Sequence, residues 1–189
     1  MLDLPEQFLI VQTPRLILRK LVIEDAEDIF AYASDPQVTT YTLWEAHQSI
    51  EDTYEYLNNI AFELYRSGKG IDFGIVEKGS NKLIGTCGLH TTPIHRRAEL
   101  GYVLARDYWG QGLMTEAAQA AISFGFHVMQ LLRIQAFCAV ENVGSARVLE
   151  KAGMQFEGIL HNYVFTKERT WDVKMYAVVR SLDCLSNYG

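Results

Sequence analysis

The chain has 189 residues, of which 49% are hydrophobic and 21% are charged. That length fits one folded domain, and the apolar content excludes an intrinsically disordered chain. The net charge is −6, from 17 basic and 23 acidic side chains without a dense basic block, so we expect no nucleic-acid partner, because phosphate contacts need a clustered basic face.

The first half of the chain begins with a strand over 15–19, where Leu16 and Leu18 share one face. Apolar residues at helical spacing predict a helix from Ala26 to Ala33, which Asp35-Pro36 ends. A longer helix is predicted from about 49 to 65, ended by Gly68 and Gly70. Its inward stripe consists of Ile50, Thr53 or Tyr54, Leu57, Ile60 or Ala61, and Leu64.

Two strands are expected next, over 71–77 and 82–90, with a hairpin turn at 78–81 between them. The second strand contains Gly85 and Gly88. Glycine inside a strand indicates a bend or a close approach of another part of the chain.

The second half predicts a strand at 99–104, a helix reaching about Met129, and a buried strand at 132–140. A helix follows over 142–151, and Gly153 ends it. Two closing strands are expected at about 155–165 and 170–180. The order β α α β β β α β α β β predicts one mixed α/β domain over 1–180, followed by a polar tail at 181–189.

The three cysteines, Cys87, Cys138 and Cys184, are far apart. Such a pattern predicts reduced thiols in a cytoplasmic protein, with neither a disulfide frame nor a metal site. No basic residues precede the short apolar stretch 8–11, so we expect no signal peptide. No stretch approaches the roughly 20 apolar residues that span a bilayer, so we expect no membrane partner.

A strand followed by Gly-x-Gly and a helix occupies 99–116. Gly110 and Gly112 allow the backbone to approach a ligand, and free amides at the start of a helix favour a phosphate or pyrophosphate. A tight turn without a ligand remains the alternative. The phosphate-binding pattern GxxxxGK[ST] is absent, and Thr115 stands where a dinucleotide fingerprint has its third glycine.

The second candidate ligand site is Asn142-x-x-Ser145, which directly follows a predicted strand. Asn142 is a good N-cap, whose side-chain oxygen can accept the N–H of Ser145. This capping role can coexist with a ligand contact. Ser145 is either a solvated hydroxyl or a functional one.

Four segments together resemble the GNAT superfamily of N-acetyltransferases, in its RimJ/RimL-like branch. They are TPRLILR at 13–19, GTCGL at 85–89, AELGYVLARDYWGQGLMTEA at 98–117 and ENVGSARVLEKAGM at 141–154. The resemblance runs from about residue 13 to 180. It implies a mostly antiparallel sheet that is splayed between the strands 99–104 and 132–140 and flanked by helices, with acetyl-CoA bound in the opening.

The resemblance also implies the residues that bind acetyl-CoA. Backbone groups of Tyr102, Val103 and Leu104 are expected to pair with the pantetheine arm, and Asn142 to contact it. The pyrophosphate is expected on the backbone amides of Gly110, Gln111, Gly112, Leu113, Met114 and Thr115. Met114 departs from the Ala or Gly usual there, and Met154 from the usual Phe.

Catalysis requires a base for the amine and a hydrogen-bond donor for the departing sulfur. Ser145 matches the serine that the family places near the thioester. Glu99, at the start of the strand that lines the cleft, is the candidate base, acting through water; the alternative is an ion pair of Glu99 with Arg96 or Arg97. Weaker candidates are His90, His95, His161 and Asp172, of which Asp172 has either a substrate-cleft or a structural role.

The predicted activity is acetyl transfer from acetyl-CoA to a primary amine, with an α-amine favoured. The branch includes enzymes that act on ribosomal-protein N-termini, so such an N-terminus is a possible partner. The alternative is a catalytically silent acyl-CoA-binding module of the same fold. The oligomeric state, monomer or homodimer, stays open.

Overall fold

The computed structural model describes residues 10–180. Its strands are β1 (Val11–Gln12), β2 (Leu16–Lys20), β3 (Gly70–Glu77), β4 (Lys82–Thr92), β5 (Arg97–Leu104), β6 (Arg133–Ala139), β7 (Gln155–Thr166) and β8 (Arg169–Val179). Its helices are α1 (Ala26–Ala33), α2 (Ile50–Tyr56), α3 (Phe62–Ser67), α4 (Leu113–His127) and α5 (Val143–Lys151). The predicted tail, Cys184 and the first nine residues lie outside the described range.

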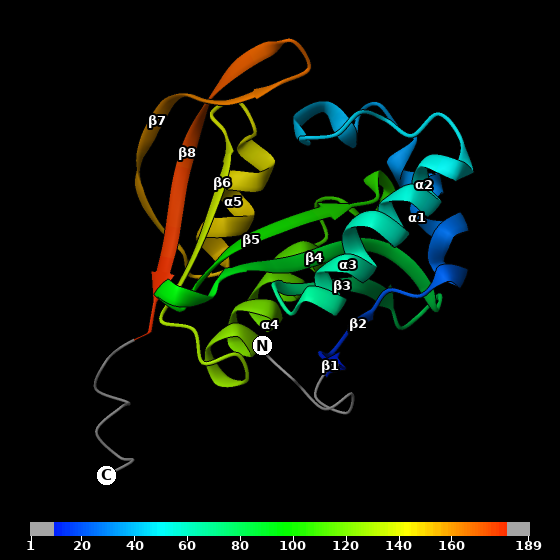
Figure 1. The fold of residues 1–189 in the computed structure, drawn as a ribbon, viewed down its shortest axis with the longest axis horizontal. Helices are drawn as coiled ribbons and strands as arrows, with labels where there is room; N and C mark the ends of the chain where they lie inside the picture. The colour runs from blue at the N-terminus through cyan, green and yellow to red at the C-terminus, as the bar shows by residue number, and fades with distance from the viewer. Residues whose placement is uncertain (1–9, 181–189) are drawn as a thin grey trace.

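One sheet contains all eight strands, in the order β1-β2-β3-β4-β5-β6-β8-β7 (Figure 1). Every neighbouring pair is antiparallel except β5 and β6, which are parallel. The predicted mixed α/β class and the mostly antiparallel sheet are therefore confirmed. The short strand β1 is an addition, since two residues are too few to show a period-2 pattern.

The predicted helix 49–65 is present but is not regular along its length. A π-helical turn at Leu57–Ala61 separates α2 from α3, and Gly68 ends the run with a φ of 63°. Thr53, Leu57 and Ala61 are buried, whereas Ile60 is exposed. A π turn inserts one residue into the helical repeat, so the buried stripe shifts at that point.

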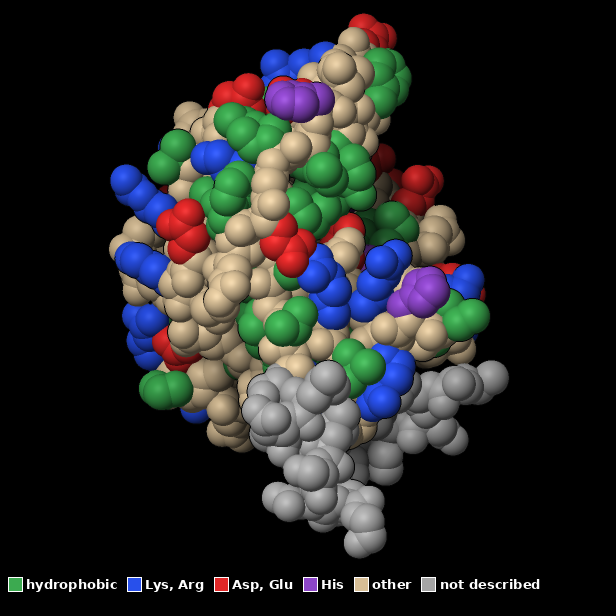
Figure 2. Space-filling view, turned by 90° about the vertical axis from the view of Figure 1, so that its left-hand side faces the viewer, with side chains coloured by type: hydrophobic (Ala, Val, Ile, Leu, Met, Phe, Trp, Pro, Cys, Tyr) green, Lys and Arg blue, Asp and Glu red, His purple; other side chains and the backbone are tan. Residues whose placement is uncertain are grey.

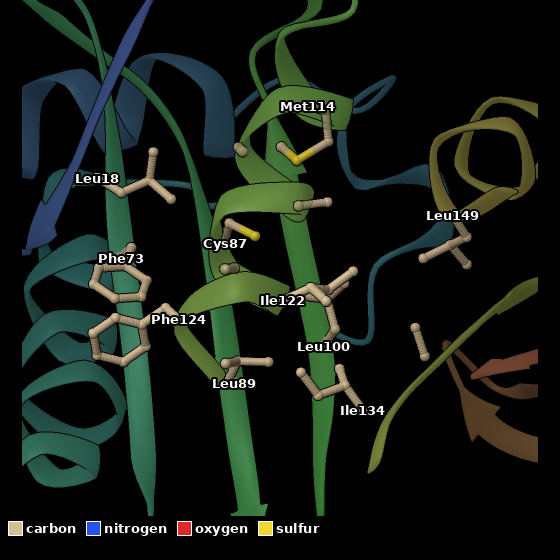
Figure 3. Packing of buried hydrophobic residues seen from close by; sticks show 14 of the residues in the cluster. Leu18, Phe73, Cys87, Leu89, Leu100, Met114, Ile122, Phe124, Ile134 and Leu149 are labelled. Carbon is tan, nitrogen blue, oxygen red and sulfur yellow. The ribbon is translucent and has the colours of Figure 1, made fainter. Parts of the chain in front are cut away.

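Two apolar clusters cover the two faces of the sheet. The larger one lies under α4 and α5, where the rings of Phe73 and Phe124 meet edge to face at 5.1 Å (Figure 3). Ala117 and Ala121 of α4 are fully buried, which lets that helix lie close to the strands. The smaller cluster lies under α1 and α2 on the opposite face. No helix within residues 10–180 is long and apolar enough to cross a membrane.

The strand glycines mark close approaches, as the sequence predicts. A Cβ on Gly85 would lie 2.2 Å from the carbonyl oxygen of Val103 on β5. A Cβ on Gly88 would lie 2.7 Å from a carboxylate oxygen of Asp72 on β3. Both positions therefore exclude a side chain.

The outer strand β7 carries several exposed apolar side chains. Phe156, Ile159, Tyr163 and Phe165 are each more than 40% exposed. Figure 2 shows hydrophobic side chains gathered on the side of the molecule that carries β7 and β8. In Figure 1, β6 borders the left-hand side of the opening beside β5, and β8 and β7 lie beyond β6.

Candidate active site

The sheet opens between β5 and β6. These strands pair only at their first residues, where Arg97 to Glu99 face Arg133 to Gln135. Strand β5 continues beside β4 as far as Leu104, while β6 continues beside β8 (Figure 1). Beyond Glu99 one edge of β5 has no neighbouring strand among the described residues, so the backbone groups on that edge are available to a ligand. The predicted splay is thus present at these two strands.

The glycine loop lies between β5 and α4. Gly110 and Gly112 have φ values of 72° and 75°, a region that favours glycine. Gly112 is the N-cap of α4 and supplies no side chain to cap the first amides. The side chains of Leu113 and Met114 are buried, so they do not cover the backbone amides at the start of α4. This arrangement fits a pyrophosphate, which needs free amides at a helix start and no Cβ in its path.

The loop is held in place by the segment before β2. Glu116 of α4 accepts hydrogen bonds from the Thr13 hydroxyl at 2.6 Å and from the Arg15 amide at 2.9 Å. The Arg15 guanidinium pairs with Glu116 at 2.7 Å and donates to the Gln111 carbonyl at 2.9 Å. Thr13 and Arg15 belong to a motif noted in the sequence, but their role in fixing this loop could not be read from it.

These contacts also set the ionisation of Glu116. Partial burial raises the pKa of Glu116, but the hydrogen bonds from Thr13 and Arg15 outweigh that effect and leave the pKa below its ordinary value. Glu116 is therefore a carboxylate at neutral pH. It keeps the guanidinium of Arg15 beside the glycine loop.

Trp109 contacts the last residue of β5. Its indole N–H donates to the Leu104 carbonyl at 2.7 Å. A pantetheine arm that pairs with Leu104, as predicted, would meet a carbonyl that already has an internal partner. The Val103 carbonyl lies against Gly85 of β4, so Tyr102 is the most accessible of the three predicted residues.

Asn142 and Ser145 lie at the start of α5, beside the opening. The Asn142 side-chain oxygen accepts the Ser145 amide at 3.0 Å, so the predicted N-cap is confirmed. The Ser145 hydroxyl lies 2.8 Å from the hydroxyl of Tyr102, which reaches across from β5. Burial raises the pKa of Tyr102, so this hydroxyl keeps its proton. The sequence predicted only a backbone role for Tyr102.

Glu99 lies on the other face of the sheet. Residues alternate along β5, with Ala98, Leu100 and Leu104 in the cluster under α4. Glu99 therefore points to the face that carries α1 to α3, directly across from His90 on β4. No ion pair or side-chain hydrogen bond of Glu99 occurs within residues 10–180. Arg96 instead donates to the Gln130 carbonyl at 2.7 Å.

The weaker candidates lie elsewhere. His161 Nδ1 is 2.7 Å from Asp172, in the hairpin of β7 and β8. Hydrogen bonds from the Asn162 amide and from His161 lower the pKa of Asp172. The pair lines a hollow of about 310 Å³ at the end of β6. Asp172 thus fixes the irregular turn of β7, and His95 lies in an exposed 3-10 turn.

The comparisons with known proteins agree with this geometry. A family model described as an acetyltransferase (GNAT) domain matches residues 15–155. The uncharacterised N-acetyltransferase YoaA of Bacillus subtilis is 38% identical, over 92% of this chain and 98% of its own length. The ribosomal-protein-serine acetyltransferase of Escherichia coli is 31% identical, over 69% of this chain and 72% of its own.

A solved structure supports the same assignment. The GNAT-family acetyltransferase from Bacillus anthracis superposes with a TM-score of 0.80 at 32% identity, and covers 90% of this chain and 98% of its own. The family match spans the splay and the glycine loop, and ends just beyond α5. The chain belongs to the GNAT acetyltransferase family, and it is an N-acetyltransferase that uses acetyl-CoA.

Proposed function

We propose that this enzyme acetylates an α-amine, such as a peptide or protein N-terminus or an amino-acid-like small molecule. One observation supports the transfer chemistry that this proposal requires: Glu99 and Ser145 flank the same opening from opposite faces of the sheet. An acyl transfer needs a base on the amine side and a donor on the sulfur side. These two residues meet that requirement from the two sides of β5.

On the amine side, Glu99 accepts the proton of the incoming ammonium through water. Its carboxylate has no competing ion pair among the described residues, so it is free for this task. His90 faces it across the β4–β5 pair and is the nearest alternative base on the register. The Val103 backbone faces β4, so the backbone amide of Leu104 is the candidate donor to the oxygen on which negative charge develops.

On the sulfur side, acetyl-CoA supplies the acyl group as a thioester. The Ser145 hydroxyl, at the positive end of α5, donates a hydrogen bond to the leaving sulfur. Tyr102 lies 2.8 Å from Ser145 Oγ and supports it as a second protonated hydroxyl. The hydroxyls of Tyr102 and Ser145 form a short hydrogen-bonded chain, in which one hydroxyl polarises the other.

The choice of an α-amine rests on proton chemistry and on relatives. An α-amine has a pKa of about 7.7–8.0 against about 10.4 for lysine, which corresponds to about 3.4 kcal/mol less work to reach the neutral nucleophile. A carboxylate acting through water is a weak base, so the more acidic ammonium suits it. The E. coli relative is named for a ribosomal protein. A spermidine N(1)-acetyltransferase of Vibrio cholerae is more distant, at 26% identity over 88% of the chain.

Two matched peptides and one polyamine test the proposal. One peptide has a free N-terminus and no lysine, and the other is N-blocked with a single lysine. Release of CoA should be fastest with the free N-terminus, and mass spectrometry should place the acetyl group there. Faster modification of the blocked peptide or of spermidine would contradict the proposal. Binding of acetyl-CoA without turnover on any amine would favour the silent binding module instead.

A further inference from the structure

We infer that Asp72 forms a subsite for a cationic group of the acceptor, next to the amine that is acetylated. This inference rests on the proposed function and narrows its substrate class to α-amines that carry a second, positively charged group. The site combines a buried carboxylate, an open position over Gly101, and the open edge of β5.

Asp72 lies on β3 under the α1–α3 layer and is only 9% exposed. One carboxylate oxygen, Oδ2, accepts a hydrogen bond from the Tyr56 hydroxyl at 2.5 Å. The other, Oδ1, accepts no hydrogen bond from any residue in 10–180. It lies over Gly88, where a Cβ would stand 2.7 Å away. Half of the carboxylate therefore remains free for a ligand.

The protein supplies little charge to balance Asp72. No lysine or arginine within residues 10–180 forms an ion pair with it, and exposed His90 is the basic group that acts on it. Burial raises the pKa of Asp72, against the effects of Tyr56 and His90. A buried carboxyl without a counter-ion is costly to ionise, so a cation from a ligand would be bound strongly.

Two glycines, Gly88 and Gly101, lie between Asp72 and the opening. Gly88 faces Asp72 on one side and Gly101 of β5 on the other. A Cβ on Gly101 would meet nothing within 4 Å, so the space above it is empty. Gly101 lies two residues from Glu99 on the same face of β5. With strands spaced by about 4.8 Å, the carboxylate is roughly 5–10 Å from the open edge of β5.

The distance between the open edge of β5 and the Asp72 carboxylate sets how far apart the amine and the cationic group of the acceptor must be. Its amine stands beside Glu99 at the opening, and its cationic group reaches across Gly101 and Gly88 to Oδ1 of Asp72. A peptide with arginine at its second position meets this description, because one residue step of about 3.8 Å and a long side chain span the gap. Arginine is the better probe than lysine, since its guanidinium stays charged and offers no second amine to acetylate.

The test compares Ala-Arg-Ala amide with Ala-citrulline-Ala amide, in which a neutral urea replaces the guanidinium. The wild-type enzyme should prefer the arginine peptide by roughly tenfold or more in kcat/KM, as for a hydrogen bond to a charged group. Asp72→Asn keeps the size of the side chain and an oxygen for Tyr56. It should abolish the preference and leave the citrulline peptide and the KM for acetyl-CoA unchanged. Glu63→Gln, on the exposed surface of α3, removes the same charge and should keep the preference.

The outcomes separate this inference from the proposed function. Equal use of both peptides by the wild type, or a preference that persists in Asp72→Asn, would overturn the subsite and leave the α-amine proposal standing. If neither peptide is acetylated, the α-amine proposal fails, and calorimetry on the CoA complex decides the subsite. Tighter binding of the arginine peptide by the wild type but not by Asp72→Asn supports it, and equal binding refutes it.

A measurement on the wild type covers the case in which Asp72→Asn does not fold. The side-chain carboxyl ¹³C resonance of Asp72 is followed by NMR while each peptide is added. A shift with the arginine peptide and none with the citrulline peptide supports the subsite. The same response to both, or to neither, overturns it.

Discussion

Replacement of Gly112 by valine tests the assignment of the pyrophosphate loop. Gly112 is the N-cap of α4 and has a φ of 75° and a ψ of 4°. That left-handed conformation costs an L-residue about 1–2 kcal/mol, and a β-branched side chain is the least tolerant of it. We take about 2 kcal/mol for valine.

This strain translates into a measurable loss of affinity. In the variant the loop is expected to leave the left-handed region, and CoA binding must drive it back. At about 1.4 kcal/mol for each factor of ten, the cost corresponds to a roughly 30-fold weaker binding of CoA. The isopropyl group also stands among the first amides of α4 and hinders the anion, so 30-fold is the expected minimum.

Calorimetric titration of CoA gives the affinity, and Gly153→Val provides the control. Gly153 follows α5 with a φ of 93°, and a Cβ there would meet nothing within 4 Å. It carries the same kind of backbone strain at the end of α5 away from Asn142. This control should lower Tm by about 4–8 °C, since about 1 kcal/mol shifts Tm by 2–4 °C in a domain of this size. It should bind CoA normally. A CoA affinity of Gly112→Val within about threefold of wild type would refute the placement.

Three further predictions concern the chemistry and the loop. Glu99→Gln should lower kcat by roughly 10²–10⁴-fold at an unchanged KM for acetyl-CoA; near-normal turnover in a steady-state assay would reassign the base to His90 or water. Ser145→Ala should cause a smaller loss, and adding Tyr102→Phe should cost little more, because the two hydroxyls act together; fully additive losses would show that they act separately. The pKa of Glu116 is lower in the folded state than in the unfolded state. The ionised Glu116 side chain therefore stabilises the folded protein above its unfolded pKa, about 4.3, and this stabilisation is lost as the pH falls through the folded pKa. Thermal unfolding should therefore show the advantage of wild type over Glu116→Gln shrinking below about pH 4.3; a constant difference would contradict this.

The spacing of apolar residues, together with the residues that end or cap helices, predicts the order of the helices and strands. The alternation of Leu16 and Leu18, the stop at Gly68 and the cap at Asn142 are local signals, and the structure contains each of them. The π turn at 57–61 is not a local signal, because the apolar pattern there fits a regular helix equally well.

The parts of the site that escaped prediction depend on distant contacts. Arg15 and Glu116 are 101 residues apart, and nothing in either segment indicates that one holds the other. Tyr102 and Ser145 are 43 residues apart, and their contact requires that β5 and α5 meet beside the splay. Asp72 lies in an ordinary buried strand, and its position beside two facing glycines appears only once the register of β3, β4 and β5 is known.

One competition experiment tests the central claim most directly. A peptide that carries both a free N-terminal amine and an internal lysine is incubated with the enzyme and acetyl-CoA, and fragment masses locate the added acetyl group. The two amines share one concentration and one reaction, so the ratio of products reports the preference alone. We predict acetylation of the α-amine in large excess over lysine in the wild type, and loss of that product in Glu99→Gln. Acetylation mainly on lysine, or an α-acetyl product that Glu99→Gln leaves unchanged, would contradict the account.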